Sequence, residues 1–183
     1  MRIITGIRKG MNLETVDGIN TRPTESRIKE SLFNILGDVS DSRVLDLFAG
    51  SGAIGLEFLS RGANSVSFIE NNPDSLKALK KNIDKFKTEN AIVINKDYKA
   101  ALTELSEKSI LFDYIYVDPP YDKLEYYEYA LEFIFKNNLL EDKGLLIIEA
   151  KEGIIINNLS YYDNIDTRTY RSTIIYFLRR KED

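Results

Sequence analysis

The stretch that decides the fold is Val44-Leu45-Asp46-Leu47-Phe48-Ala49-Gly50-Ser51-Gly52-Ala53-Ile54-Gly55. It places a Gly-x-Gly-x-x-Gly sequence directly between an apolar strand and a helix, which is the context in which such a loop binds a nucleotide-type cofactor. Gly50 and Gly52 allow the backbone to approach a ligand closely, and Gly55 allows tight packing of the helix on a sheet. Glu70, 20 residues after Gly50, ends the next strand, where a carboxylate can bind the hydroxyls of a ribose. The stretch therefore predicts a Rossmann-like cofactor site.

The charge of Asp46, four residues before Gly50, indicates the type of cofactor. A carboxylate there would repel the diphosphate of a dinucleotide, which needs an open helix N-terminus. It would attract S-adenosylmethionine, which carries a sulfonium and an ammonium and no phosphate. Unit charges about 4 Å apart attract by several kcal/mol at an intermediate dielectric. We therefore expect S-adenosylmethionine, with S-adenosylhomocysteine as product and no metal. A nicotinamide-dependent oxidoreductase is the more distant alternative.

Strands and helices alternate along most of the chain. The expected strands are 44–48, 65–70, 91–95, 114–118 and 145–150, and the expected helices are 53–61, 73–86, 98–105 and 125–137. This alternation predicts right-handed crossovers and a parallel sheet covered on both faces. Residues 162–167 and 173–178 are typical of two tightly joined strands. The predicted fold class is therefore α/β, with a mostly parallel seven-stranded sheet that ends in an antiparallel hairpin.

The first 37 residues have a different pattern. Glycines break residues 1–21 into short strands, and Thr24 can cap a helix that ends at Gly37. We expect a small N-terminal β-hairpin plus helix extension over residues 1–37 and the cofactor-binding domain over residues 38–183.

A second motif, Asp118-Pro119-Pro120-Tyr121, follows an apolar and aromatic strand. The prolines stiffen the backbone and leave carbonyls without competing N–H donors nearby. The carboxylate and a carbonyl can accept hydrogen bonds from an –NH2 group, while Tyr121 offers a ring on which a base can stack. The motif is therefore suited to hold a planar amine. The alternative is a strand that ends in a Pro-Pro turn with an incidental aspartate.

The composition excludes several kinds of chemistry. The 183 residues contain no Cys and no His, so a disulfide, a thiolate or His-ligated metal and a Ser-His triad are excluded. No apolar stretch approaches the ~20 residues that a membrane helix needs. Together these features are typical of a cytoplasmic protein that does not bind membranes.

These residues, in this order, resemble the class I S-adenosylmethionine-dependent methyltransferases. Asp118 to Tyr121 is similar to the [DN]-P-P-[FYW] motif of enzymes that methylate exocyclic amines of nucleobases. The resemblance narrows to the RsmD family of bacterial 16S rRNA guanine-N2 methyltransferases, and it spans nearly the whole chain. The segments that carry it are 4–10, 21–24 with Arg27, Glu30, Leu32, Phe33 and Asn34, then 46–52, 60–63 and 170–173.

The resemblance implies methyl transfer from S-adenosylmethionine to the exocyclic N2 amine of a guanine in 16S rRNA, the guanine numbered 966 in that RNA. The target amine would lie against the catalytic candidates Asp118, Pro119, Pro120 and Tyr121. The cofactor loop would fall on Asp46, Gly50 and Gly52, the ribose on Glu70 and the adenine on Asp97. The cofactor-binding candidates with their flanking residues are Asp46, Phe48, Ala49, Gly50, Ser51, Gly52, Glu70, Asn71, Asp97 and Tyr98. Asp97 could equally cap the helix that follows it.

The expected partner is 16S rRNA within a 30S subunit or an assembly intermediate, with the enzyme acting as a monomer. Because the Asp118 motif suits any planar amine, another amino-methyltransferase, acting on adenine N6 or on a protein glutamine, remains an alternative. A non-catalytic RNA-binding module is disfavoured by the intact Asp118 and Asp46.

The net charge of −4 is unevenly spread, because residues 1–30 carry six Lys and Arg against four Asp and Glu. Phosphate binding depends on local charge and not on the total. The RNA-contact candidates are Arg8, Lys9, Arg22, Thr24 and Arg27. Ion pairs of Arg22 and Arg27 with Glu25 or Glu30 are the alternative. Three tyrosines could add an RNA-facing patch, although packing in the core is expected for at least one of them: Tyr126, Tyr127 and Tyr129.

Overall fold

The computed structural model describes residues 1–16, 23–120 and 123–181, and for residues 23–25 it describes the backbone alone. The chain divides into two compact units, Met1–Lys96 and Asp97–Asp183, which are described separately.

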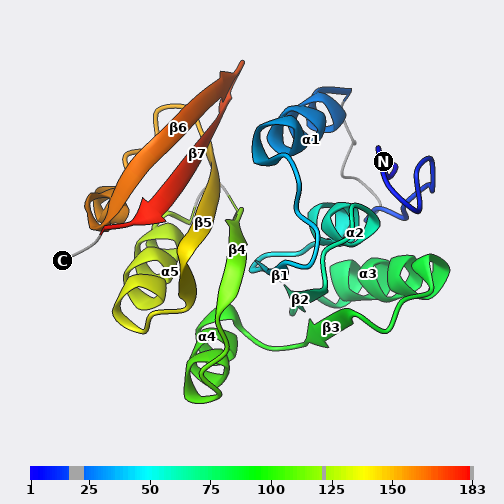
Figure 1. The fold of residues 1–183 in the computed structure, drawn as a ribbon, viewed down its shortest axis with the longest axis horizontal. Coiled ribbons are helices and arrows are strands. Elements are labelled where there is room, and N and C mark those ends of the chain that lie inside the picture. The colour runs from blue at the N-terminus through cyan, green and yellow to red at the C-terminus, as the bar shows by residue number, and fades with distance from the viewer. Residues whose placement is uncertain (17–22, 121–122, 182–183) are drawn as a thin grey trace. The chain divides into compact units, whose positions relative to one another are not determined.

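The first unit contains three parallel strands in the order β3-β2-β1 (Figure 1). The strands are β1 (Arg43–Asp46), β2 (Ser65–Ile69) and β3 (Ala91–Ile94), and the helices are α1 (Pro23–Leu36), α2 (Ala53–Ser60) and α3 (Pro73–Phe86). All but the first residue of both β1 and β2 are buried, which is typical of parallel strands that are covered on both faces.

Local sequence signals explain where α3 begins. The Asn72 side chain accepts hydrogen bonds from the backbone N–H groups of Asp74 (3.0 Å) and Ser75 (3.1 Å), so it caps the helix. Pro73 occupies the first turn, where its missing N–H costs nothing. The predicted bounds 73–86 are confirmed.

The N-terminal segment, residues 1–16, is less regular than expected. Instead of a pair of strands it forms a loose hairpin with one isolated antiparallel bridge, between Arg2 and Asn12. The physical reason is that two of its backbone N–H groups bond to a side chain of α2. Those of Ile4 and Thr5 donate to the Glu57 carboxylate (2.8 and 3.0 Å), so they cannot extend a strand ladder.

Glu57 on α2 anchors this segment. Its side chain is fully buried and also forms ion pairs with Lys29 Nζ (3.1 Å) and Arg61 Nε (2.9 Å). Lys29 Nζ donates in addition to the backbone oxygen of Arg2 (2.8 Å). Burial lowers the pKa of Lys29, while the Glu57 charge opposes that shift. One buried carboxylate thus joins the N-terminal segment, α1 and α2.

Ser60, one turn after Glu57, holds the next part of the segment. Its hydroxyl donates to the Thr5 oxygen (2.6 Å) and accepts from the Arg8 N–H (3.0 Å). A Cβ at Gly6 would overlap the Ser60 carbonyl, and the φ of Gly6 is +88°. Only glycine therefore allows the backbone to lie this close to α2.

The second unit contains four strands in the order β4-β5-β7-β6. The strands are β4 (Phe112–Val117), β5 (Leu140–Lys151), β6 (Tyr162–Tyr170) and β7 (Thr173–Arg180), and the helices are α4 (Tyr98–Glu107), α5 (Leu124–Lys136) and a short 3₁₀ turn at Asn157–Tyr161. β4 and β5 are parallel, whereas β7 is antiparallel to both β5 and β6. The predicted C-terminal hairpin is confirmed.

The described residues therefore contain seven strands and five α-helices, which alternate up to β5 as expected. The predicted α/β class, mostly parallel with an antiparallel end, is confirmed. β5 begins five residues before the expected strand, because Leu140 already pairs with Phe112 ahead of a register shift. Among the described helices, none has the length and apolar character required to cross a membrane.

We expect Glu57→Ala to lower the free energy of unfolding by about 3–5 kcal/mol, because it leaves Lys29 buried without its partner. Urea unfolding followed by circular dichroism measures this. Glu30→Ala is the control, since Glu30 is exposed on α1 and its loss should change the stability by less than about 0.5 kcal/mol. Equal effects of the two substitutions would contradict the anchoring role of Glu57.

Candidate functional site

Asp46 is the last residue of β1 and has an exposed fraction of 2%. Its Oδ2 accepts a hydrogen bond from the backbone N–H of Gly55 (3.1 Å) in the first turn of α2. Among the described residues, no Lys or Arg forms an ion pair with this carboxylate. It is therefore a buried acid that one N–H group stabilises.

Burial raises the pKa of Asp46 to about 7, and the negative charge of Glu70 adds to the rise, while the Gly55 N–H opposes it. Desolvation disfavours the ionised form of any buried acid that lacks a cation. A cationic ligand beside Asp46 would reverse this shift, so the site has the chemistry of an acceptor for positive charge.

Glu70 follows β2 and links that strand to the glycine loop. Its Oε2 accepts from the Gly50 N–H (2.8 Å), and its Oε1 accepts from the N–H groups of Asn71 (2.9 Å) and Asn72 (2.8 Å). A carboxylate has about four acceptor positions, so three are already used. To bind two hydroxyls of a ribose, Glu70 would have to release at least one of these N–H groups.

The three glycines of the loop have different roles. A Cβ at Gly50 would meet nothing within 4 Å, and its φ is +54°, so this residue provides an open approach to the backbone. A Cβ at Gly52 would overlap Leu79 of α3. A Cβ at Gly55 would overlap Phe68 of β2. The predicted packing role of Gly55 is confirmed, and Gly52 shares it.

The residues around the loop are held by the backbone and by Asn82. The Ala49 N–H donates to the oxygen of Ile69 (2.9 Å), and Phe48 is half-buried. Asn82 of α3 is fully buried, and its amide donates to the oxygens of Ser51 (2.8 Å) and Glu14 (3.0 Å). Sequence reasoning missed Asn82, because a polar residue at a core position of a helix shows its role only once its partners are known.

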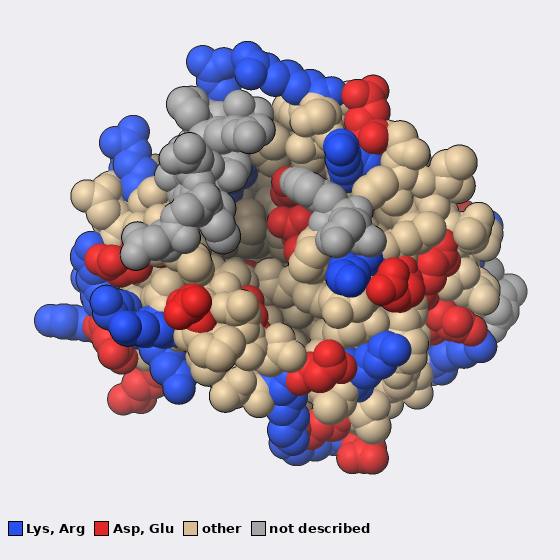
Figure 2. All heavy atoms as spheres, turned by 180° about the vertical axis from the view of Figure 1, so that it is seen from behind, with Lys and Arg blue, Asp and Glu red and all other residues tan. Residues whose placement is uncertain are grey.

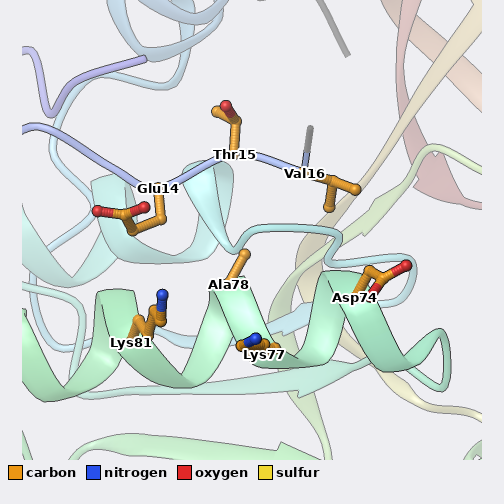
Figure 3. Close-up of a pocket in the computed structure, with 7 residues that line it drawn as sticks. All are labelled: Glu14, Thr15, Val16, Asp74, Lys77, Ala78 and Lys81. Atoms are coloured by element: carbon orange, nitrogen blue, oxygen red, sulfur yellow. The ribbon is translucent and has the colours of Figure 1, made fainter. Parts of the chain in front are cut away.

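A pocket of about 280 Å³ lies between the N-terminal segment and α3. In Figure 3, Glu14 and Thr15 lie above α3, from which Lys77 and Lys81 project. The lining residues are Glu14, Thr15, Val16, Asp74, Lys77, Ala78 and Lys81. Two ammonium and two carboxylate groups balance each other, so the lining has no net charge that would select an anion or a cation.

In the second unit, Asp118 directly follows β4 and is half-buried. Pro119 is buried, whereas Pro120 is exposed and its carbonyl accepts from the Lys123 N–H (3.0 Å). The predicted partner Tyr121 lies outside the described residues. The Asp-Pro-Pro sequence thus stands at the carboxyl end of a parallel strand, which is where α/β proteins bind ligands.

Glu149 is an acidic residue next to Asp118 that sequence reasoning missed. Val117 pairs with Ile148 in the parallel β4–β5 ladder, and extending that register by one residue places Glu149 beside Asp118. Its carboxylate accepts a hydrogen bond from the Tyr116 hydroxyl. The signal was present in the sequence, since Glu149 ends the apolar run of β5 as Asp118 ends that of β4.

Asp97 is exposed and caps α4, because its Oδ1 accepts from the Lys99 N–H (2.9 Å). Tyr98 is buried against Tyr126 and Tyr129, with ring centroids 4.7 and 5.7 Å away. The capping alternative for Asp97 is thus confirmed, and its contact with adenine stays a prediction.

The third tyrosine of the expected RNA-facing patch, Tyr127, is fully buried. Its hydroxyl donates to the backbone oxygen of Glu149 (3.0 Å). Packing in the core is confirmed for this residue.

The RNA-contact candidates have different environments. Arg8 Nε donates to the Phe86 oxygen (2.8 Å), whereas Lys9 and Arg27 are exposed. Arg22 and the side chain of Thr24 lie outside the described residues. On the face in Figure 2, Lys and Arg are interspersed with Asp and Glu, so charge distribution alone does not single out a contact surface.

Comparison with known proteins identifies the family. A family model described as Conserved hypothetical protein 95 matches residues 1–179. The chain belongs to this family. It is 37% identical over 152 residues to ribosomal RNA small subunit methyltransferase D of Escherichia coli K12, covering 82% of this chain and 75% of that protein. It is 38% identical over 151 residues to the candidate rRNA methyltransferase YlbH of Bacillus subtilis, covering 81% of this chain and 82% of that protein. The predicted membership of the RsmD family is confirmed.

Solved structures agree with this assignment. The candidate methyltransferase yhhF of Escherichia coli has a TM-score of 0.83 at 30% identity, covering 100% of this chain and 99% of that one. A more distant methyltransferase candidate, SMU.776, solved in complex with SAH, has a TM-score of 0.70 at 13% identity and covers 85% of this chain and 49% of its own. The second likeness concerns the fold alone.

We expect Asp46→Asn to stabilise the ligand-free protein, and the gain to depend on pH. The folded-state pKa is raised to about 7 from about 3.9 in the unfolded chain. Between about pH 4 and pH 7 the unfolded chain loses the Asp46 proton while the folded protein retains it, so the fold is destabilised increasingly over that range. The difference between variant and wild type should therefore grow over that range to about 4 kcal/mol and stay constant above it. Urea unfolding at pH 5, 6 and 8 measures it.

The control is Asp84→Asn, because Asp84 is exposed on α3. A pH-independent difference for Asp46→Asn would contradict the raised pKa.

Proposed function

We propose that the protein transfers a methyl group from S-adenosylmethionine to the exocyclic N2 amine of a guanine in 16S rRNA, the guanine numbered 966. The observation that carries the proposal is the 37% identity to ribosomal RNA small subunit methyltransferase D over 82% of the chain. The reaction would take place in the cytoplasm, on a 30S subunit or an assembly intermediate, with the enzyme as a monomer.

The acidic side chains of the first unit suit a cationic cofactor without phosphate. S-adenosylmethionine, when bound, supplies the methyl group and leaves as S-adenosylhomocysteine. Asp46 would lie beside the positive charge of the cofactor, which would reverse the rise in its pKa. Glu70 would accept from the ribose hydroxyls after releasing a backbone N–H, and Gly50 would let the loop lie close to the ligand. Asp97, the first residue of the second unit, is the candidate that we propose for the adenine amino group, through the oxygen that the cap leaves available.

The Asp118 motif would hold the target amine. The lone pair of an aromatic exocyclic amine is delocalised into the ring, which makes the nitrogen a poor nucleophile. Hydrogen bonds from its two N–H groups to the Asp118 carboxylate and the Pro119 carbonyl would draw the nitrogen toward tetrahedral geometry. Stacking of the base on Tyr121, worth about 1–3 kcal/mol, would fix the plane of the ring for in-line attack.

This chemistry needs no strong base, which suits a chain without histidine. Positive charge develops on the amine as the nitrogen–carbon bond forms, so the Asp118 carboxylate stabilises the transition state more than the ground state. The nitrogen then loses a proton to solvent. Because a paired base could not enter such a site, the target guanine would be flipped or unpaired.

The exposed Lys9 and Arg27 are the candidates that we propose for phosphate contacts, together with Arg22. Arg8 is used within the fold, where its Nε donates to Phe86, so we assign it a mainly structural part. The extension over residues 1–37 would then act with the cofactor domain on the RNA.

The most direct test is methylation of 30S particles and of free 16S rRNA with labelled S-adenosylmethionine, followed by mass spectrometry of the nucleosides and mapping of the modified base. N2-methylguanosine at guanine 966 supports the proposal. N6-methyladenosine, or label in protein glutamine, would instead support an amino-methyltransferase of a different substrate class.

We expect Asp118→Ala to reduce methyl transfer by at least 100-fold while S-adenosylmethionine binds as in the wild type, because this carboxylate contacts the amine and not the cofactor. Transfer is measured with labelled donor and binding by calorimetry. Asp113→Ala, a substitution near the other end of β4, is the matched control. Normal turnover of the Asp118→Ala variant would contradict the proposal that Asp118 holds the target amine.

We expect the affinity for S-adenosylmethionine to fall about five- to tenfold between pH 7.5 and pH 6. The reason is that only the ionised form of Asp46 attracts the cation, and with a pKa of about 7 that form becomes the minority at pH 6. Calorimetry at the two pH values measures this. The Asp46→Asn variant should bind S-adenosylmethionine more weakly than the wild type and with the same affinity at both pH values. The Asp84→Asn variant should behave as the wild type. An unchanged wild-type affinity would contradict the assignment of Asp46.

A further inference from the structure

Glu149 occupies a position that the proposed reaction does not yet use. It lies near the carboxyl end of β5, and the register that pairs Val117 with Ile148 brings it beside Asp118. Neighbouring strands lie about 4.8 Å apart, so continuing this register by one residue past the end of β4 would put the two acidic residues at neighbouring positions on this edge of the sheet. Both are half-buried, and both can therefore meet a ligand at this edge.

Three contacts fix Glu149 in place. The Tyr116 hydroxyl, on the neighbouring strand, donates to its carboxylate. The hydroxyl of the fully buried Tyr127 on α5 donates to its backbone oxygen (3.0 Å). On the other side, Glu149 pairs with the fully buried Ile175 of β7. The position is thus held from both neighbouring strands and from a helix, which is how a recognition group is preorganised.

A second hydrogen-bond acceptor beside the Asp118 motif would distinguish between guanine and adenine. In guanine, the N2 amine is next to N1–H, which is also a donor. In adenine, the N6 amine is next to N1, which is an acceptor. A carboxylate beside the Asp118 motif would accept a hydrogen bond from N1–H of guanine, but it would face the lone pair on N1 of adenine.

We propose that Glu149 accepts a hydrogen bond from N1–H of the target base, and thereby selects guanine over adenine. The inference rests on the proposed function and specifies its substrate. Tyr116 is the positioning residue, because its hydroxyl orients the Glu149 carboxylate. The glutamate side chain is one methylene longer than that of Asp118, so it can reach past the amine to the adjacent ring nitrogen.

The test compares two RNAs that carry the same N2 amine. One has guanine at the target position, and the other has 2-aminopurine, whose N1 is an acceptor. We expect wild-type kcat/KM to be higher for guanine by about 10- to 100-fold or more. Glu149→Gln should reduce that ratio at least tenfold, because an amide can donate to N1 of 2-aminopurine. A purely structural role would lower both rates equally and leave the ratio unchanged, which would overturn the proposal.

Two further variants complete the experiment. Tyr116→Phe should also lower the ratio of kcat/KM for guanine to that for 2-aminopurine, because the Glu149 carboxylate loses the hydroxyl that orients it. This variant keeps the proposal testable if Glu149→Gln does not fold. Asp142→Asn, an exposed residue near the other end of β5, should leave both rates unchanged. An unchanged ratio in both Tyr116→Phe and Glu149→Gln would refute the role of Glu149 while leaving guanine methylation intact. Failure of the wild type to methylate guanine RNA at all would instead refute the proposed function.

Discussion

The buried Glu57 carboxylate constrains the first unit more than any other single group. A charge without exposure to water must be compensated, and here two backbone N–H groups, Lys29 and Arg61 surround it. These partners come from the N-terminal segment, from α1 and from the C-cap of α2. The segment is therefore part of the fold and not a separate arm. Arg8 of the same segment, one of the RNA-contact candidates, donates to the backbone of α3.

Asp46 is buried to a similar degree but has no such compensation among the described residues. Within the described part of the chain, its hydrogen-bond donor is the Gly55 N–H, and burial raises its pKa. An acid kept in this state costs stability, and a neutral side chain of the same shape would avoid the cost. The difference between the two carboxylates is informative. Glu57 is paired with two cations within the fold, whereas Asp46 keeps a raised pKa that a cationic ligand, such as the proposed cofactor, would reverse.

The elements were predictable where the sequence carries local signals. The glycine loop, Pro73 after Asn72 and the apolar runs of the strands depend on neighbours in sequence, and their positions were confirmed within a few residues. Features that depend on distant partners were not predictable. Gly52 is required because Leu79 packs against it, and Asn82 is buried because Ser51 and Glu14 need its amide. Glu149 is an intermediate case, because the end of an apolar run marks it in the sequence, but only the β4–β5 register relates it to Asp118.

The absence of histidine and cysteine gives the pH dependence of this chain an unusual origin. Without them, no side chain has an unperturbed pKa near neutrality, yet burial brings Asp46 to about 7. The groups proposed for the amine, Asp118 and Glu149, act as hydrogen-bond acceptors. A change of activity that enters through cofactor binding at Asp46 would appear in KM for the cofactor. A chemical step that depended on a titrating base would instead alter kcat.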